Sequence, residues 1–135
     1  MEAQTGMRVN TVTQPYWDGV EQGKLMLQHC SACGAYQYYA RPLCAKCHAA
    51  EPEWREASGN GVLYSYSVVS RGPSPAFQAI VPYVTAIVEL EEGPRMFTNI
   101  VDADPESLRV GEPVSVVFRE GPEGLRLPYF RPAGA

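Results

Sequence analysis

The sequence has no excess of basic residues. Eleven Lys and Arg stand against fifteen Asp and Glu, so the formal net charge is −4. Proteins that bind nucleic acids usually carry a basic patch or stripe that contacts the phosphates. The charge balance therefore disfavours a nucleic-acid-binding role.

Long apolar runs are absent as well. The chain shows no stretch of the length that a transmembrane helix needs, and no apolar core of a signal peptide. We therefore expect a cytoplasmic protein without membrane contact, in which the cysteines stay reduced. Apolar residues still make up 45% of the 135 residues, which is normal for a globular protein of one ordinary domain or two very small ones.

The sequence also lacks a recognisable catalytic motif. It shows no Ser/His/Asp order, no glycine-rich phosphate loop and no carboxylate pair that can be assigned to a metal. The two histidines, His29 and His48, flank the cysteines and are poor candidates for a general base. We expect no catalytic residues and no enzyme activity in the isolated chain.

The four cysteines form two Cys-x-x-Cys pairs, Cys30 with Cys33 and Cys44 with Cys47. A Cys-x-x-Cys turn, or knuckle, places two sulfurs on one side of a tight loop, and two knuckles supply four thiolates in a tetrahedron. Gly34 follows the first pair, where a positive φ is often required. The spacing predicts a closed, structural Zn²⁺ site, with iron in the same four ligands as the alternative.

Disulfide bonds or a redox function would fit the cysteines less well. Two disulfides would need an oxidising compartment, and a single redox pair would leave the second pair without a role. Four thiolates already complete the coordination sphere, so we expect His29 and His48 at the surface of the knuckles rather than as ligands. A closed sphere leaves no position for water or substrate, which indicates a structural metal.

A short helix is predicted before the cysteines, from Pro15 to Gln22. Pro15 suits the first helical position, and Gly23 suits the end. Tyr16 and Trp17 are two large aromatic residues whose apolar surface so short a helix cannot bury by itself. They either pack on the knuckles or form an arm that docks on a partner protein, and both alternatives remain open.

The rest of the chain is typical of a mainly β protein, and its twelve Gly and twelve Pro favour many turns. We expect a short strand at Leu25–Gln28, a hairpin arm over Ala35–Pro42 and a polar connector over Glu51–Asn60. Five further strands are expected at Val62–Val69, Tyr83–Leu90, Arg95–Val101, Pro113–Arg119 and Leu125–Phe130.

A short helix is expected between the third and fourth of these five strands, where Asp104 can cap and Pro105 can begin it. This order is that of a five-stranded OB-fold barrel, and an open SH3-like sheet is the alternative. The expected organisation is a flexible N-terminus over 1–14, a helix and rubredoxin-like zinc ribbon over 15–54, and an OB-fold over 55–135.

Together these features resemble the DUF35 family, whose members join a rubredoxin-like zinc ribbon to an OB-fold. The resemblance runs from Pro15 to Pro132, and no single motif carries it. The motifs, in chain order, are Pro15–Gly19, Cys30–Gly34, Arg41–Cys47, Gly61–Tyr66, Val81–Val84, Thr98–Val101, Val110–Val114 and Leu127–Pro132. His48 departs from the family pattern, in which glycine often follows the last cysteine, but the ligand set is unaffected.

The resemblance implies an accessory subunit that binds a thiolase-superfamily enzyme and supports its acyl-CoA chemistry. Such partners are thiolases, lipid-transfer-protein-like aldolases or acyltransferases, and hydroxymethylglutaryl-CoA-synthase relatives; some relatives accompany a MaoC-like hydratase. The segment from Arg71 to Pro82 could reach the acyl-CoA, although a surface salt bridge is the more usual role for a residue such as Arg71, and Phe77 could equally pack under the barrel. The candidate contacts to partner or acyl-CoA are Arg71, Phe77, Tyr16 and Trp17.

Two other functions compete with this interpretation. One is nucleic-acid binding by the OB-fold, with Tyr64, Tyr66 and Phe97 as stacking platforms. The other is electron transfer by a rubredoxin-like iron site. The net charge opposes the first, and the second would leave the barrel without a purpose.

Overall fold

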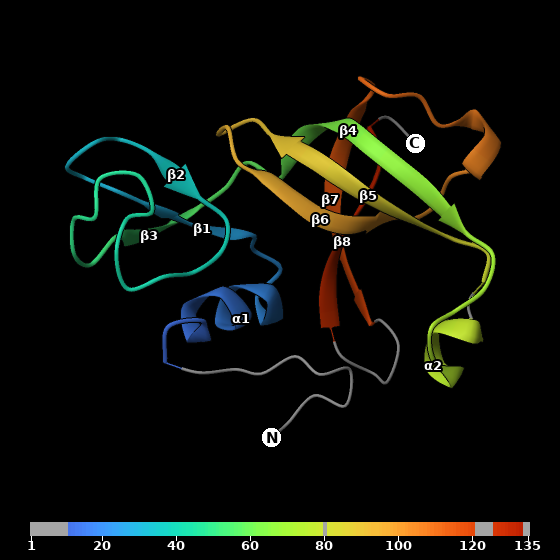
Figure 1. The fold of residues 1–135 in the computed structure, drawn as a ribbon, viewed down its shortest axis with the longest axis horizontal. Helices are drawn as coiled ribbons and strands as arrows, with labels where there is room; N and C mark the ends of the chain where they lie inside the picture. The colour runs from blue at the N-terminus through green and yellow to red at the C-terminus, as the bar shows by residue number, and fades with distance from the viewer. Residues whose placement is uncertain (1–10, 80, 121–125, 134–135) are drawn as a thin grey trace.

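Two β structures lie side by side along the long axis of the molecule (Figure 1). The computed structural model describes residues 11–79, 81–120 and 126–133. One structure is a three-stranded sheet accompanied by a helix, and the other is a closed five-stranded barrel. The fold is therefore mainly β, as the sequence predicts.

Helix α1 covers Gln14–Glu21, one residue earlier at each end than predicted. Its buried face consists of Tyr16, Gly19 and Val20, at the spacing of neighbouring turns. A Cβ at Gly19 would lie 2.4 Å from the Cγ of Met26. Glycine at this position therefore lets the helix approach the chain that leads into the first strand.

The small sheet has the order β2-β1-β3, with β1 at Met26–His29, β2 at Tyr36–Gln37 and β3 at Glu53–Glu56. The expectation of a polar connector over 51–60 is wrong at β3, because all four of its residues pair antiparallel with β1. Strand β3 lies at the edge of the sheet, and three of its four side chains are exposed charged residues. This charge hides the strand pattern in the sequence.

The barrel has the closed strand order β4-β5-β6-β8-β7. Its strands are β4 (Asn60–Val69), β5 (Tyr83–Leu90), β6 (Arg95–Ile100), β7 (Pro113–Glu120) and β8 (Arg126–Pro132). The closed barrel confirms the predicted OB-fold and not the open SH3-like sheet. Leu125, the first residue of the expected last strand, lies outside the described residues. Between β6 and β7 lies a 3₁₀ turn, η1 (Pro105–Ser107), which Asp104 caps by accepting a hydrogen bond from the Glu106 amide at 3.0 Å.

The segment that joins β4 to β5 contains a short helix, α2 (Pro75–Gln78), where the sequence predicted no element. The amide of Gln78 donates to Ser74 O at 2.8 Å, and its side chain accepts a hydrogen bond from the Gly72 amide at 2.7 Å. Helix α2 and the three-stranded sheet lie at opposite ends of the molecule (Figure 1).

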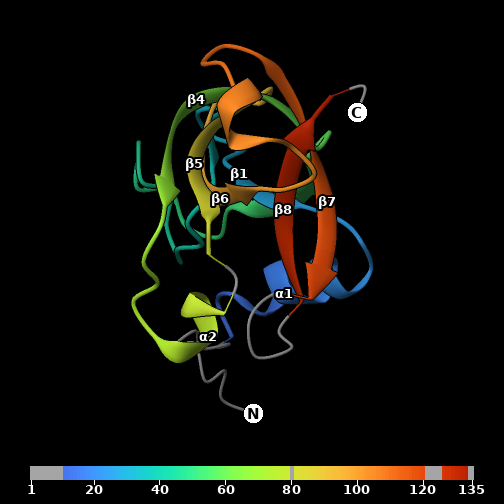
Figure 2. The same ribbon diagram turned by 90° about the vertical axis from the view of Figure 1, so that its right-hand side faces the viewer.

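One hydrophobic core runs through both β structures. Strand β5 alternates strictly, and Val84, Ala86, Val88 and Leu90 all point inward. The same core includes Tyr16 and Val20 of α1, Leu25 just before β1 and Leu27 within β1. Helix α1 lies against the end of the β7–β8 pair (Figure 2), where the Arg126 side chain donates to Val20 O at 3.2 Å.

No helix among the described residues combines the length and the apolar character that crossing a membrane requires.

Candidate metal centre

The two Cys-x-x-Cys knuckles share one backbone design. In the first, the Gly34 amide donates to Cys30 O at 2.7 Å; in the second, the His48 amide donates to Cys44 O at 2.9 Å. Gly34 and His48 both have positive φ angles, of 78° and 65°. The prediction that a left-handed residue follows the first knuckle is confirmed, and the second knuckle places a histidine in the same conformation.

The four cysteine sulfurs converge between the knuckles and lie within 4.8 Å of one another. The Sγ atoms of Cys30 and Cys47 are 3.5 Å apart, and those of Cys33 and Cys44 are 3.7 Å apart. Metal–sulfur bonds of about 2.3 Å in a tetrahedron place neighbouring sulfurs about 3.8 Å apart. The arrangement of the sulfurs thus fits one four-coordinate metal ion.

Two of the cysteines are buried and two are exposed. Cys30 and Cys44 keep only 3% and 2% of their surface exposed, whereas Cys33 and Cys47 face solvent. Each close sulfur pair joins a buried cysteine of one knuckle to an exposed cysteine of the other. A bound ion would therefore link the exposed cysteine of each knuckle to the buried cysteine of the other knuckle.

The electrostatics of the cluster also favour a cation. The amides of Cys47 and Lys46 donate to the Cys44 sulfur and lower the pKa of Cys44 to about 6. The Ala49 amide favours the Cys47 thiolate too, but the neighbouring sulfurs, that of Cys30 foremost, outweigh it and raise the pKa of Cys47 to about 12. Four sulfurs this close cannot all ionise by themselves, whereas a central metal ion stabilises all four thiolates.

Two glutamine side chains hold the second knuckle in place. Gln28, which is 3% exposed, donates to Arg41 O and accepts from the Arg41 amide, both at 2.9 Å. Its oxygen also accepts a hydrogen bond from the Gln37 side chain at 2.6 Å. Gln37 in turn accepts from the Ala45 amide at 2.9 Å. Sequence reasoning missed this network, which ties β1 and β2 to the chain around Cys44.

Neither histidine belongs to the sulfur cluster. His48 is exposed, as expected. His29 is only partly exposed: its side chain is 14% exposed, with Nδ1 at 3.6 Å from a carboxylate oxygen of Glu53 and its ring 4.7 Å from that of Tyr36. The expectation of a surface position therefore holds for His48 but only in part for His29.

The aromatic residues of α1 do not form an exposed arm as a pair. Tyr16 is only 8% exposed, and its ring lies 5.1 Å from that of Trp17 and 5.9 Å from that of Tyr38. Burial raises the pKa of Tyr16 well above its ordinary value. Tyr16 is thus a core residue, which favours the packing alternative over the docking arm for this side chain. Trp17 is partly exposed, and Tyr39, 64% exposed, is a further surface aromatic that the sequence did not single out.

The structure does not bring Arg71 near the sulfur cluster. Arg71 is exposed and belongs to the segment between β4 and α2, and α2 lies at the end of the molecule opposite the three-stranded sheet (Figure 1). Phe77 lies in α2, but its side chain is outside the described residues, as is all of Ile80.

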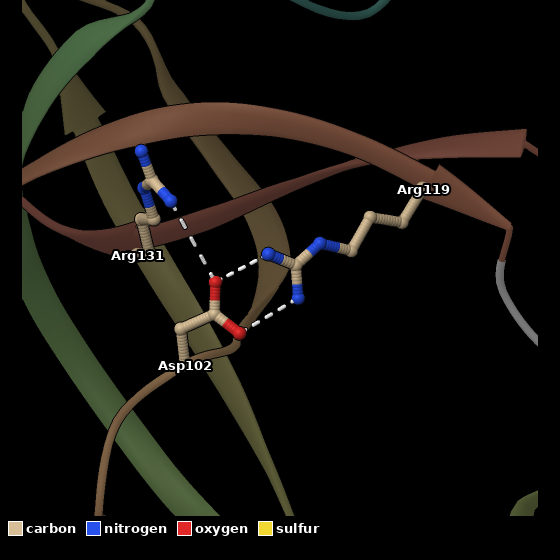
Figure 3. Close-up of polar contacts among 3 residues, drawn as sticks. All are labelled: Asp102, Arg119 and Arg131. Atoms are coloured by element: carbon tan, nitrogen blue, oxygen red, sulfur yellow. Dashed lines mark hydrogen bonds and ion pairs between the residues drawn. The ribbon is translucent and has the colours of Figure 1, made fainter. Parts of the chain in front are cut away.

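An exposed ion-pair cluster of Asp102, Arg119 and Arg131 lies on the barrel (Figure 3). Asp102, just after β6, accepts two hydrogen bonds from the guanidinium of Arg119, one of them at 2.8 Å, and lies 3.8 Å from Nη1 of Arg131. The bonds from Arg119 lower the pKa of Asp102. Strands β6 and β8 share a single paired position, Ile100 with Phe130, so this cluster joins β6 to β7 and β8 where the barrel has few backbone bonds.

Family models match both halves of the chain. The rubredoxin-like zinc ribbon domain of ChsH2 matches residues 17–53, and the C-terminal OB-fold domain of ChsH2 matches residues 54–119. The family models thus cover the knuckles and most of the barrel.

Known proteins are similar over most of the chain. A DUF35 domain-containing scaffold protein of Methanothermobacter thermautotrophicus is 43% identical over 101 residues, which are 71% of this chain and 75% of that protein. A probable enoyl-CoA hydratase alpha subunit of Thermomonospora curvata is 39% identical over 118 residues, or 87% of this chain, which spans only 36% of that subunit. The solved structure named Ltp2-ChsH2(DUF35) aldolase superposes with a TM-score of 0.83 at 37% identity and covers 94% of this chain and 98% of that one.

Proposed function

This chain belongs to the DUF35 family, which includes the zinc ribbon and OB-fold of ChsH2, and from that premise we propose that it is a non-catalytic accessory subunit of a thiolase-superfamily enzyme. Its role is to bind that enzyme and to support its acyl-CoA chemistry. The observation that carries the proposal is the superposition, over 94% of this chain, on a DUF35 chain named as part of an aldolase with Ltp2.

The sulfur cluster supports a structural role within such a subunit. We propose Zn²⁺ as the ion, with Cys30, Cys33, Cys44 and Cys47 as its ligands, and iron as the alternative. Four thiolates fill the tetrahedron, so a bound ion has no position left for water or substrate. The ion would instead stabilise the ribbon, since zinc binding to comparable peptides contributes about 10–16 kcal/mol.

The remaining side chains also favour a non-catalytic role. In the part of the chain that the structure describes, the four cysteines form the one group of three or more potential metal ligands.

The relative from Methanothermobacter thermautotrophicus carries the name of a scaffold protein. The hydratase alpha subunit from Thermomonospora curvata extends well beyond the matched region, because this chain spans 36% of it.

Both ends of the molecule offer surfaces for a partner. Trp17 and Tyr39 belong to the ribbon end, and both are aromatic residues of the type that anchors interfaces. Arg71 lies at the α2 end, and we retain Arg71 and Phe77 as candidates for contact with an acyl-CoA held by the partner. A specific interface buries at least about 1,000 Å² in total, so the partner should cover one end rather than a single side chain.

Size-exclusion chromatography with a thiolase-like enzyme encoded beside this chain tests the proposal. We expect the two proteins to co-elute and the enzyme to gain turnover or stability, while the chain alone neither condenses nor cleaves acyl-CoA. A MaoC-like hydratase is the second partner to test. Robust turnover of an acyl-CoA by the isolated chain would overturn the accessory role.

A metal analysis separates the proposed zinc site from a rubredoxin-like electron carrier. An iron tetrathiolate would colour the purified protein red and would undergo one-electron reduction, whereas a zinc site is colourless and redox-inert. We expect colourless protein with zinc bound.

A further inference from the structure

The outer face of the β4–β5–β6 sheet carries an exposed row of large side chains. Phe97 pairs with Ile87, and the pairing of β4 with β5 moves from Leu63 opposite Val88 to Ser65 opposite Ile87, so Tyr64 is an extra residue in a bulge. Tyr64 is 45% exposed and Phe97 60% exposed. The three strands lie side by side (Figure 1).

Arg95 adds a cationic plane to this row. Its guanidinium carbon lies 3.9 Å from the centroid of the Tyr64 ring, and its Nε donates to Glu89 at 3.1 Å. The guanidinium therefore reaches from β6 across β5 to β4. The Arg95 side chain remains 54% exposed, which leaves much of the group accessible to a ligand.

A hollow of about 210 Å³ lies beside Phe97. Its lining residues include Ile87 and Phe97 together with Ser65, Ser67 and Thr85, of which Thr85 already donates its hydroxyl to Ser67 O at 3.5 Å. Pockets for drug-sized ligands are larger, at about 300–1,000 Å³. The hollow is therefore suited to a single ring system with polar edges rather than to a whole ligand.

We propose that this face, the Tyr64–Arg95–Phe97 platform, binds a planar heteroaromatic ring of the nucleobase type that is carried by a small molecule. Exposed aromatic rings and guanidinium planes are the groups on which bases stack. The positive guanidinium matches the negative face of an aromatic ring. Ser65 and Ser67 of this lining carry hydroxyl groups that can bond the polar edge of a base, and an aliphatic anchor from a partner protein would leave such groups unsatisfied.

The charges of this face disfavour a polynucleotide as the ligand. Arg95 already pairs with Glu89, and the whole chain has a net charge of −4. Binding to a phosphate backbone needs several Lys or Arg to displace counterions. The inference goes beyond the accessory role, and it does not depend on a partner enzyme.

An NMR titration of the full chain with adenosine tests the platform. We expect saturable shifts in the backbone amides of Tyr64, Ile87 and Phe97. Phe97→Ala should weaken binding about tenfold, because one base–aromatic stack is commonly worth that factor or more. Arg95→Gln should also weaken it. Tyr39→Ala, which removes an exposed aromatic residue of the ribbon, is the matched control and should leave adenosine binding unchanged.

Two further probes separate the ligand classes. A short oligothymidine should bind no more tightly than adenosine and without a steep salt dependence; tight, salt-sensitive binding would replace the proposal with a polynucleotide surface. Cyclohexanol, an apolar ring without a π face, should bind at least tenfold more weakly than adenosine. Equal binding of cyclohexanol, or no saturable shift with adenosine in the folded protein, would overturn the platform.

Discussion

Gly34 and His48 hold equivalent positions in the two knuckles and share a left-handed backbone, with φ angles of 78° and 65°. The conformation costs a residue with a Cβ about 1–2 kcal/mol relative to the right-handed region. A Cβ at Gly34 would meet no atom within 4 Å, so no steric clash adds to that cost there. The two positions therefore form a matched pair for measuring backbone strain.

We expect His48→Gly to stabilise the folded protein by about 0.5–1 kcal/mol, because relief of the left-handed strain exceeds the entropy that glycine loses on folding. Gly34→Ala should destabilise it by about 1–2 kcal/mol. Denaturant unfolding of the metal-loaded proteins measures both changes. A loss of stability in His48→Gly would mean that the imidazole makes a favourable contact that outweighs its strain.

Freshly purified, reduced protein should contain one Zn²⁺ per chain, bound through the four cysteines. Cys33→Ser should weaken metal binding and loosen the knuckles, while the barrel keeps its strands, because the barrel core is apolar and contains none of the cysteines. Metal analysis measures the first effect, and amide NMR signals of β4–β8 report the second. Absence of metal from the reduced protein would contradict the metal site. Loss of the barrel signals in Cys33→Ser would show that the barrel does not fold independently of the metal.

Removal of the side-chain amide of Gln28 should weaken metal binding, although Gln28 is not a metal ligand. Gln28→Leu keeps the volume of the side chain but leaves the N–H and C=O of Arg41 without their partner. We expect a loss of about 1–3 kcal/mol in unfolding free energy, since each of the two lost hydrogen bonds contributes about 0.5–1.5 kcal/mol, together with a lower zinc affinity in competition with a chelator. Gln22→Leu, at an exposed position, is the control. Equal zinc affinity in the two variants would show that the network does not position the second knuckle.

The Asp102 cluster should contribute stability that depends on pH. Because Arg119 lowers the pKa of Asp102 below its ordinary 3.8, the stabilisation is fully present above that value and is lost as the pH falls through the folded-state pKa. Asp102→Asn, which also tolerates the φ of 57°, should therefore be less stable than the parent at neutral pH. The difference should shrink below about pH 4 and in high salt. Denaturant unfolding at a series of pH values measures it; a difference that does not change with pH would rule out the charge as its source.

The sequence predicted those features that depend on local spacing. Two Cys-x-x-Cys pairs are sufficient to predict the sulfur cluster, because each pair fixes two sulfurs within one turn. The alternation of β5 likewise identifies its inward face, from Val84 to Leu90. Strand β3 was not predicted from the sequence because an edge strand can expose charged side chains. Its Glu53, Arg55 and Glu56 are equally typical of a connector.

Features that depend on distant partners could not be predicted. Asp102 meets Arg119 and Arg131 only because the barrel register brings β7 and β8 beside the end of β6. Tyr16 is buried because α1 turns that face toward the core, which the close approach of Gly19 to Met26 allows. Neither relationship has a signal in the spacing of the residues concerned.

Binding to a thiolase-like partner should distinguish the two ends of the molecule. If the ribbon end is the docking surface, Trp17→Ala should weaken the complex about tenfold or more, because buried aromatic anchors commonly contribute about 2 kcal/mol or more. Trp17 is partly exposed, so the variant should stay folded, whereas Tyr16→Ala should unfold more easily because Tyr16 is 8% exposed in the core. Arg71→Ala is the matched change at the α2 end. Affinity measured by titration calorimetry decides between them: a loss confined to Arg71→Ala would move the interface to the α2 end, and no loss in either variant would exclude both side chains as anchors.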